Sequence, residues 1–87
     1  MMLLSVKKAE YVSGYKIKLF FNNGKSKTVD LKDTVFKDHR EIFKALRDIE
    51  YFKRFKIELN TIAWENGLDL APEYLYKLKI SDHKHLV

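Results

Sequence analysis

Apolar residues alternate with other residues most regularly between positions 15 and 31. The first half of this segment places apolar side chains at every second position: Tyr15, Ile17, Leu19 and Phe21. That is the period of a half-buried β-strand. Asn22-Asn23-Gly24 predicts a turn, and Val29 and Leu31 continue the apolar face beyond it. The segment therefore predicts a β-hairpin with one buried face.

The register of this hairpin follows from keeping charge off the buried face. A two-residue loop at Asn23-Gly24 would place Ile17 opposite Asp30. A three-residue loop with Gly24 in a left-handed conformation places Ile17 opposite Val29 and Lys16 opposite Asp30. Cross-strand partners share a face, and a type I turn followed by a glycine bulge is a common three-residue loop. We therefore predict the second register.

Other segments with the two-residue period predict three more strands. Residues 4–12 predict the first strand, with a bulge at Lys7-Lys8 because the apolar residues before and after that point differ in phase. Ser13-Gly14 supplies the turn into the hairpin. Residues 55–59 predict a fourth strand and residues 61–65 a fifth, with a turn near Asn60 between them. Their apolar side chains are Phe55, Ile57, Leu59, Ile62 and Trp64.

A helical period marks residues 38–49. Four apolar side chains fall on one stripe of such a helix, which suits packing on a sheet: Ile42, Phe43, Leu46 and Ile49. Asp38 followed by Glu41 resembles a capping box at its start. Pro72 suits the first turn of a short C-terminal helix, on which Leu75 and Leu78 share one face. We therefore predict one main helix and one short helix.

These elements predict an α+β fold: a small, mostly antiparallel sheet of about five strands packed on one main helix, with a short C-terminal helix. We expect Leu19, Val29 and Ile57 to be buried on one sheet face against the main helix. The length of 87 residues suits one domain, assigned to residues 1–80, and the polar residues 81–87 predict a flexible C-terminal tail. Because cysteine is lacking, packing rather than disulfides must hold the core.

Charge and hydropathy indicate the compartment and the kind of partner of the protein. The formal net charge of +5 weakly favours acidic partners. Met1-Met2-Leu3-Leu4 is too short for the apolar region of a signal peptide, and no apolar run reaches membrane-spanning length. We therefore expect a cytoplasmic protein with no membrane partner.

The segment from Trp64 to Tyr76 combines turn-forming and acidic residues. One interpretation is a binding loop beside Trp64 that presents four polar side chains: Glu65, Asn66, Asp69 and Glu73. The other is structural: Trp64 fills the core, Asn66-Gly67 makes a turn, and Asp69 caps the next turn. We favour the structural interpretation, because turn chemistry explains the segment without a ligand. Asp69 and Glu73 are not expected to form a catalytic pair, since a small domain offers them little burial.

No cofactor or metal site is expected. Asp82, His83 and His85 have chelate-like spacing, but they fall in the predicted tail and lack a fourth ligand in the sequence. Gly24 and Gly67 lie in separate turns, and neither precedes the Lys-Ser/Thr pair of a phosphate-binding loop. The serine residues lack the glycine-flanked motif of a catalytic nucleophile. We therefore predict that the protein is not an enzyme.

Basic residues alternate with core positions on two of the predicted strands. If both strands lie in one sheet, these residues share with Phe20 the face turned away from the main helix: Lys16, Lys18, Arg54 and Lys56. Basic side chains around an aromatic ring resemble a platform for single-stranded nucleic acid. Three acidic residues are expected to share this face and dilute its charge: Asp30, Glu58 and Glu65. A solvated face with ion pairs is therefore the plainer interpretation.

The most specific pattern in the chain is Thr61-Ile62-x-Trp64-x-Asn66-Gly67-x-Asp69-Leu70-x-Pro72-Glu73-x-Leu75-Tyr76. Together with the alternating strands and the Gly24 turn, this block resembles the bacterial family catalogued as domain of unknown function 2442. The resemblance covers about Leu4 to Tyr76. It implies a small cytoplasmic α+β domain without established catalytic residues, found alone or joined to a helix-turn-helix domain. It also implies a place for some members in toxin–antitoxin gene pairs.

We therefore predict a non-catalytic protein-interaction module, either antitoxin-like or an accessory partner of a neighbouring gene product. Phe20 is the expected contact anchor, because an aromatic ring on a mixed-charge face suits protein binding. An open sheet edge can also pair with a partner's strand or with a second copy, so self-association is expected too. The alternative is a nucleic-acid-binding domain that uses the basic residues of the sheet face.

Overall fold

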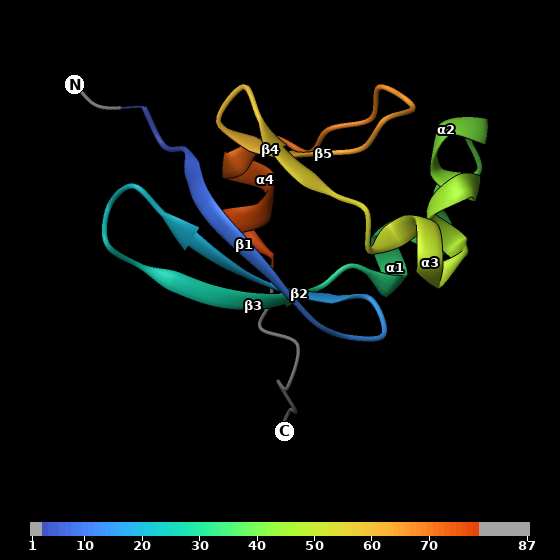
Figure 1. Cartoon of the computed structure of the whole chain (residues 1–87), viewed down its shortest axis with the longest axis horizontal. Helices are drawn as coiled ribbons and strands as arrows, with labels where there is room; N and C mark the ends of the chain where they lie inside the picture. The colour runs from blue at the N-terminus through green and yellow to red at the C-terminus, as the bar shows by residue number, and fades with distance from the viewer. Residues whose placement is uncertain (1–2, 79–87) are drawn as a thin grey trace.

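A computed structural model describes residues 3–78 of the chain (Figure 1). Strands β1 (Val6–Ser13), β2 (Lys16–Phe21) and β3 (Ser26–Asp30) form an antiparallel sheet in the order β1-β2-β3. Strands β4 (Lys56–Glu58) and β5 (Thr61–Ala63) form a separate two-stranded sheet. The helices are α1 (Lys32–Lys37), α2 (Glu41–Lys44), the 3₁₀ helix η1 (Ala45–Arg47), α3 (Ile49–Phe52) and α4 (Pro72–Lys77). The α+β class is confirmed, whereas the single five-stranded sheet and the single main helix are wrong.

The β2–β3 hairpin has the predicted register. Ile17 pairs with Val29, and Lys16 pairs with Asp30. Gly24 adopts a φ of +85°, and the backbone N–H of Phe21 donates to the C=O of Lys25 at 2.8 Å. The predicted bulge in β1 is also present, because the pairing with β2 shifts by one residue between Val6 and Lys8. The alternation of side chains and the left-handed glycine were therefore sufficient to predict this sheet.

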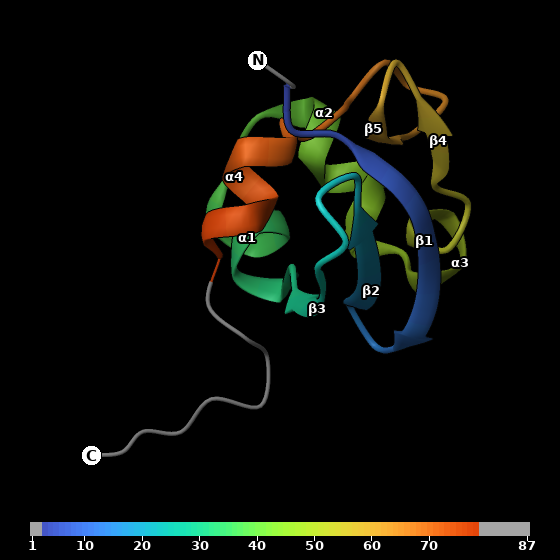
Figure 2. The same ribbon diagram turned by 90° about the vertical axis from the view of Figure 1, so that its left-hand side faces the viewer.

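The core lies between the three-stranded sheet, the helices and strand β5. Figure 2 shows α1 and α4 on one side of the three-stranded sheet and the β4–β5 hairpin beside β1. Fully buried side chains come from every layer and include Ile17, Leu19, Val29, Val35, Leu46, Phe52, Ile62, Trp64 and Leu75. The burial expected for Leu19, Val29 and the helical residues Phe43 and Leu46 is confirmed.

The predicted helix over residues 38–49 starts late and is interrupted at Asp48. Helix α2 begins only at Glu41, after Arg40 and without a side-chain cap, so the predicted capping box at Asp38 is wrong. Asp38 ends α1 with a ψ of 120°, and Asp48 has a ψ of 115° before α3. Each carboxylate accepts the backbone N–H two residues later, from Arg40 at 3.0 Å and from Glu50 at 3.0 Å. Aspartate side chains compete in this way with the helical hydrogen bonds of the backbone. The apolar stripe continues across the interruption, but α2 and η1 carry its first part and α3 carries its last residue.

Strand β4 is the second departure from the sequence prediction. Ile57 is 39% exposed, so its expected burial beside Val29 is wrong. Strand β5 is instead buried at all three of its residues. The reason is that β4 forms the outer strand of its sheet, while β5 is also bonded on its other side by the segment around Asp69. A two-residue period does not distinguish an outer strand from a strand covered on both sides.

The structure bears only in part on two predictions, the flexible C-terminal tail and the lack of a membrane-spanning segment. The predicted tail, residues 81–87, lies outside the described residues. Among residues 3–78, no helix is long and apolar enough to cross a membrane.

Candidate functional site

The loop of the β4–β5 hairpin presents the most exposed large apolar side chain among residues 3–78. Leu59 and Asn60, here called the hairpin tip, connect the paired residues Glu58 and Thr61. Leu59 is 87% exposed and has a φ of +51°, next to Asn60 at +72°. Two positive φ values are typical of a type I′ turn, which favours asparagine and glycine. Leucine at the first position is therefore unfavourable for the turn and is barely in contact with the core.

Contacts outside the loop hold the hairpin tip in this conformation. The backbone N–H of Val6 in β1 donates to the C=O of Asn60 at 2.8 Å. Ile62, just after the loop, is completely buried, so β5 cannot shift its register without leaving the core. Backbone strain that the surrounding structure maintains is found preferentially at functional positions. The hairpin tip is therefore the first candidate for a binding site.

The sequence does not mark this site clearly, because Leu59 continues the alternation of Phe55 and Ile57. That alternation assigns Leu59 to the fourth predicted strand rather than to a loop. A signal was nevertheless present, since Leu59-Asn60 separates two β-rich runs by two residues, and asparagine tolerates a positive φ. Such a spacing is typical of a tight turn, in which Leu59 occupies an exposed loop position.

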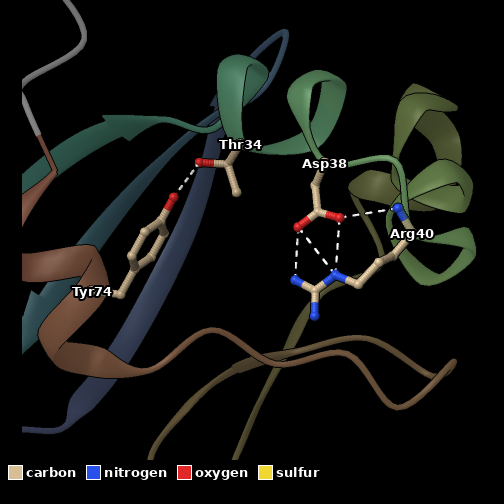
Figure 3. A network of polar contacts seen from close by, with 4 residues as sticks. All are labelled: Thr34, Asp38, Arg40 and Tyr74. Atoms are coloured by element: carbon tan, nitrogen blue, oxygen red, sulfur yellow. Dashed lines mark hydrogen bonds and ion pairs between the residues drawn. The ribbon is translucent and has the colours of Figure 1, made fainter.

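A cleft of about 570 Å³ between α1 and α4 is the second candidate (Figure 3). Thr34 of α1 and Tyr74 of α4 meet there, with their hydroxyl oxygens 2.7 Å apart. Asp38 and Arg40, between α1 and α2, form a bidentate ion pair whose Oδ2–Nη2 distance is 2.7 Å. Apolar residues also line the cleft: Phe43, Leu70, Ala71 and Leu78.

The charged groups of this cleft are largely paired with one another. Hydrogen bonds from the Arg40 side chain, and then from its backbone N–H, lower the pKa of Asp38 to about 2. Asp38 in turn raises the pKa of Arg40. Lys37 and Asp33 lie 3.8 Å apart in a further ion pair. A carboxylate with so low a pKa remains ionised near neutral pH, so Asp38 is poorly suited to proton transfer.

Trp64 and Asn66 have structural contacts. Trp64 is buried, and its Nε1–H donates to the C=O of Phe52 at 2.9 Å. The Asn66 side chain accepts the backbone N–H of Leu68 at 3.1 Å and donates to the C=O of Ile42 at 2.9 Å. The core position of Trp64 and the predicted turn at Asn66-Gly67 are thus confirmed. Asn66 also ties this turn to α2, which the sequence did not predict.

The structure does not bring Asp69 and Glu73 of the same segment together in one site. Helix α4 begins after Ala71 with Pro72 in its first turn and without a side-chain cap, so the predicted capping role of Asp69 is wrong. Proline favours the first helical position because its ring already has a helical φ. Asp69 lines the cleft, whereas Glu73 is exposed in α4 and lies outside the lining. A ligand-binding role for either residue stays a prediction.

The predicted basic face is divided between two sheets. Lys16 and Lys18 lie in β2, whereas Arg54 precedes β4 and Lys56 lies within it. The condition that both strands share one sheet is therefore not met. Acidic residues accompany three of these cations. Asp30 is the cross-strand neighbour of Lys16, Glu10 is the cross-strand neighbour of Lys18, and the Glu58 carboxylate lies 3.6 Å from the Lys56 ammonium group.

Phe20 is half-buried rather than openly exposed. The ammonium groups of Lys8 and Lys18 lie 5.4 and 5.2 Å from the centroid of its ring. Such cation–π contacts cover part of the ring. The expectation of an open aromatic anchor is therefore wrong, while a role of Phe20 in partner binding stays a prediction.

Metal-binding residues do not cluster in the part of the chain that the structure describes. Residues 3–78 contain no group of three His, Asp or Glu side chains placed to hold an ion. His39 is exposed between α1 and α2. Asp82, His83 and His85 lie outside the described residues, so their predicted lack of a metal stays a prediction.

Fold and surface together define a small α+β domain whose described polar groups form structural contacts rather than a recognisable catalytic centre. The chain belongs to the family described as Protein of unknown function (DUF2442), whose sequence pattern matches residues 6–81. This match confirms the family resemblance seen in the sequence. Searches among curated proteins and among solved structures found no match.

Proposed function

We propose that this protein is a non-catalytic protein-interaction module and that Leu59 at the hairpin tip is its principal contact. The observation that carries the proposal is a leucine that is 87% exposed at a positive φ. Burying a leucine side chain contributes roughly 1.5–3 kcal/mol. Because Leu59 is exposed in the fold, most of this free energy is available for binding in a pocket on a partner. Asparagine or glycine at this position would suit the turn better.

The proposed partner is the product of a neighbouring gene, bound in the manner of an antitoxin or an accessory subunit. The net charge of +5 favours a partner with an acidic surface. An apolar side chain on a rigid turn that is bonded to β1 suits a small pocket on such a partner, because little conformational entropy is lost on binding.

Nucleic-acid binding is the competing function, and the structure favours it less. The cations expected to form one platform lie on two sheets, and three of the four are accompanied by carboxylates. Affinity for nucleic acid depends on cations that are free to neutralise phosphates. Binding of an oligonucleotide is therefore an alternative outcome of the test below.

The test compares Leu59→Asn with Val12→Asn, because Val12 is also exposed but lies at the opposite end of β1 from Val6. Affinity for the purified products of the flanking genes would be measured by calorimetric titration. We expect Leu59→Asn to weaken binding at least about tenfold, since contact anchors contribute 1.4 kcal/mol or more. Val12→Asn should change the affinity by less than about threefold.

Two results would overturn the proposal. One is an unchanged affinity in the Leu59→Asn variant. The other is a wild-type protein that binds none of the flanking gene products but binds single-stranded oligonucleotides, with an affinity that falls in a Lys16→Ala, Lys18→Ala double variant. The second result would support the nucleic-acid function instead.

A further inference from the structure

One edge of the three-stranded sheet has unpaired backbone groups in the described part of the chain. The N–H of Phe21 donates to the C=O of Lys25, and the N–H of Leu31 donates to the C=O of Tyr15, each at 2.8 Å. Because bonding to one neighbour recurs at every second residue of a strand, the alternate residues of β3 point their N–H and C=O groups away from β2. These residues are Ser26, Thr28 and Asp30. None of their outward backbone groups has a backbone partner within residues 3–78.

The opposite edge of the sheet is already engaged. Val6 of β1 donates its N–H to the C=O of Asn60, and β1 lies against both β4 and β5. Strand β3 therefore forms the open edge of this sheet in the structure (Figures 1 and 2). Open edges are the usual place for strand addition from another chain.

Lys27 could protect this edge from pairing, but its side chain is hydrogen-bonded to another part of the protein. An inward-facing lysine commonly protects an edge strand from pairing, and Lys27 lies on the same face of β3 as buried Val29. Its ammonium group, however, donates to the C=O groups of Tyr76 and Leu78 at 2.6 Å each. A cation at this place satisfies carbonyls at the end of a helix. The edge itself thus offers short side chains, with hydroxyl groups on Ser26 and Thr28.

We propose that a second copy of this chain occupies the edge, with the two β3 strands antiparallel about a two-fold axis at Thr28. This register aligns all three outward residues of each strand. Thr28 then faces its own equivalent, and Ser26 faces Asp30 of the second copy. Threonine pairs and hydroxyl–carboxylate pairs across strands are favourable, and the symmetry forms each unlike pair twice.

Two other symmetric registers with a hydrogen-bonded pair on the axis are worse. An axis at Asp30 would place two carboxylates directly opposite each other, which is destabilising. An axis at Ser26 would align fewer outward groups, because the turn at Gly24 lies just before Ser26. A second copy therefore matches this edge in both hydrogen bonding and charge. Since both copies carry a net charge of +5, added salt should strengthen the dimer rather than weaken it.

Cysteine crosslinking tests the register directly, because the natural chain contains no cysteine. In the proposed dimer the two Thr28 Cα atoms lie about 5.5 Å apart, within reach of a disulfide. Thr28→Cys should therefore crosslink under mild oxidation. Ser26→Cys is the matched control, since its equivalents would lie about 13 Å apart along the antiparallel strands. Crosslinking of Ser26→Cys as fast as Thr28→Cys would overturn the proposed register.

Sedimentation of the unmodified protein tests the dimer itself. We expect a dimer for the wild type and for Thr28→Ser, and a monomer with an unchanged circular dichroism spectrum for Thr28→Lys, which opposes two charges at the axis. A wild type that is monomeric at every soluble concentration would overturn the proposal. The dimer is independent of the proposed partner at the hairpin tip: Leu59→Asn should still form it. Loss of partner binding with the dimer retained, or the reverse, shows which of the two proposals fails.

Discussion

The two hairpin turns of this protein use positive φ values in different ways. In the β2–β3 turn, Gly24 has a φ of +85°, and a Cβ at this position would meet no atom within 4 Å. In the β4–β5 turn, Leu59 has a φ of +51°. Glycine adopts such values freely, whereas the left-handed region costs an ordinary residue roughly 1–2 kcal/mol. One turn carries the residue that suits its geometry, and the other does not.

The difference shows where each turn obtains its conformation. The Gly24 turn follows from local chemistry, because its glycine, its loop length and the alternation of β2 and β3 all specify the same register. The Leu59 turn is imposed by its surroundings, through the hydrogen bond from Val6 to Asn60 and the burial of Ile62. A residue that is unfavourable for its own turn and exposed to solvent is more readily explained by binding than by folding.

The largest expected loss of stability distinguishes β5 from β4 in the second hairpin. Ile62→Ala should lower the free energy of unfolding by about 2–5 kcal/mol, because Ile62 is completely buried. Its cross-strand partner Ile57 is 39% exposed, and Ile57→Ala should cost less than about 1 kcal/mol. Urea denaturation measures both values. Equal losses would show that β4 and β5 do not differ in burial as described.

Gly24→Ala tests the first turn. The substitution should destabilise the protein by about 1–2 kcal/mol, entirely through backbone strain, since the added Cβ has open space around it. Lys25→Ala, at the neighbouring exposed position, is the control and should stay within about 0.5 kcal/mol of the wild type. Denaturant melts of the two variants make the comparison. A neutral Gly24→Ala would mean that the turn does not depend on a left-handed residue.

Leu59→Asn tests the second turn and should have the opposite sign. We expect a gain of about 0.5–1 kcal/mol, because asparagine tolerates the left-handed conformation better than leucine and little core contact is lost. Thermal and urea unfolding would both register the gain. A clear loss of stability would contradict the view that Leu59 contributes little to the fold.

A third turn, at residues 38–40, extends the comparison because an ion pair holds it. Arg40 keeps the pKa of Asp38 at about 2, below its ordinary value of 3.8. A carboxyl with a lowered pKa adds stability that is fully present above pH 3.8 and is lost as the pH falls towards 2. In Arg40→Gln, the pKa of Asp38 should rise towards 3.8, which an NMR titration of the carboxyl carbon detects. A pKa that stays near 2 would assign the shift to another group.

Much of the fold followed from sequence periodicity. The alternation from Tyr15 to Leu31 and the position of Gly24 predicted the β2–β3 register residue by residue. The core position of Trp64 and the turn at Asn66-Gly67 also followed from the sequence. Such features are local, because each depends on a few neighbouring residues whose preferences agree.

The sequence was less informative where two local preferences conflict. Residues 38–49 carry a helical stripe, but the Asp38 side chain binds the backbone N–H of Arg40 ahead of α2, and the Asp48 side chain binds that of Glu50 and interrupts the helix. The sequence does not predict helix α1, since it has six residues and Val35 as its one buried residue. The candidate cleft depends on α1 and α4, so it could not be anticipated either.

The sequence alone determined the α+β class, the family, the register of β2 and β3, and the core positions with a clear period. Only the tertiary structure decided that the strands form two sheets, that β5 rather than β4 is covered on both sides, and that Leu59 projects into solvent. Alternation specifies which side chains share a face, but not which neighbour covers it. That depends on contacts between distant segments, such as the hydrogen bond from Val6 to Asn60, which local preferences do not encode.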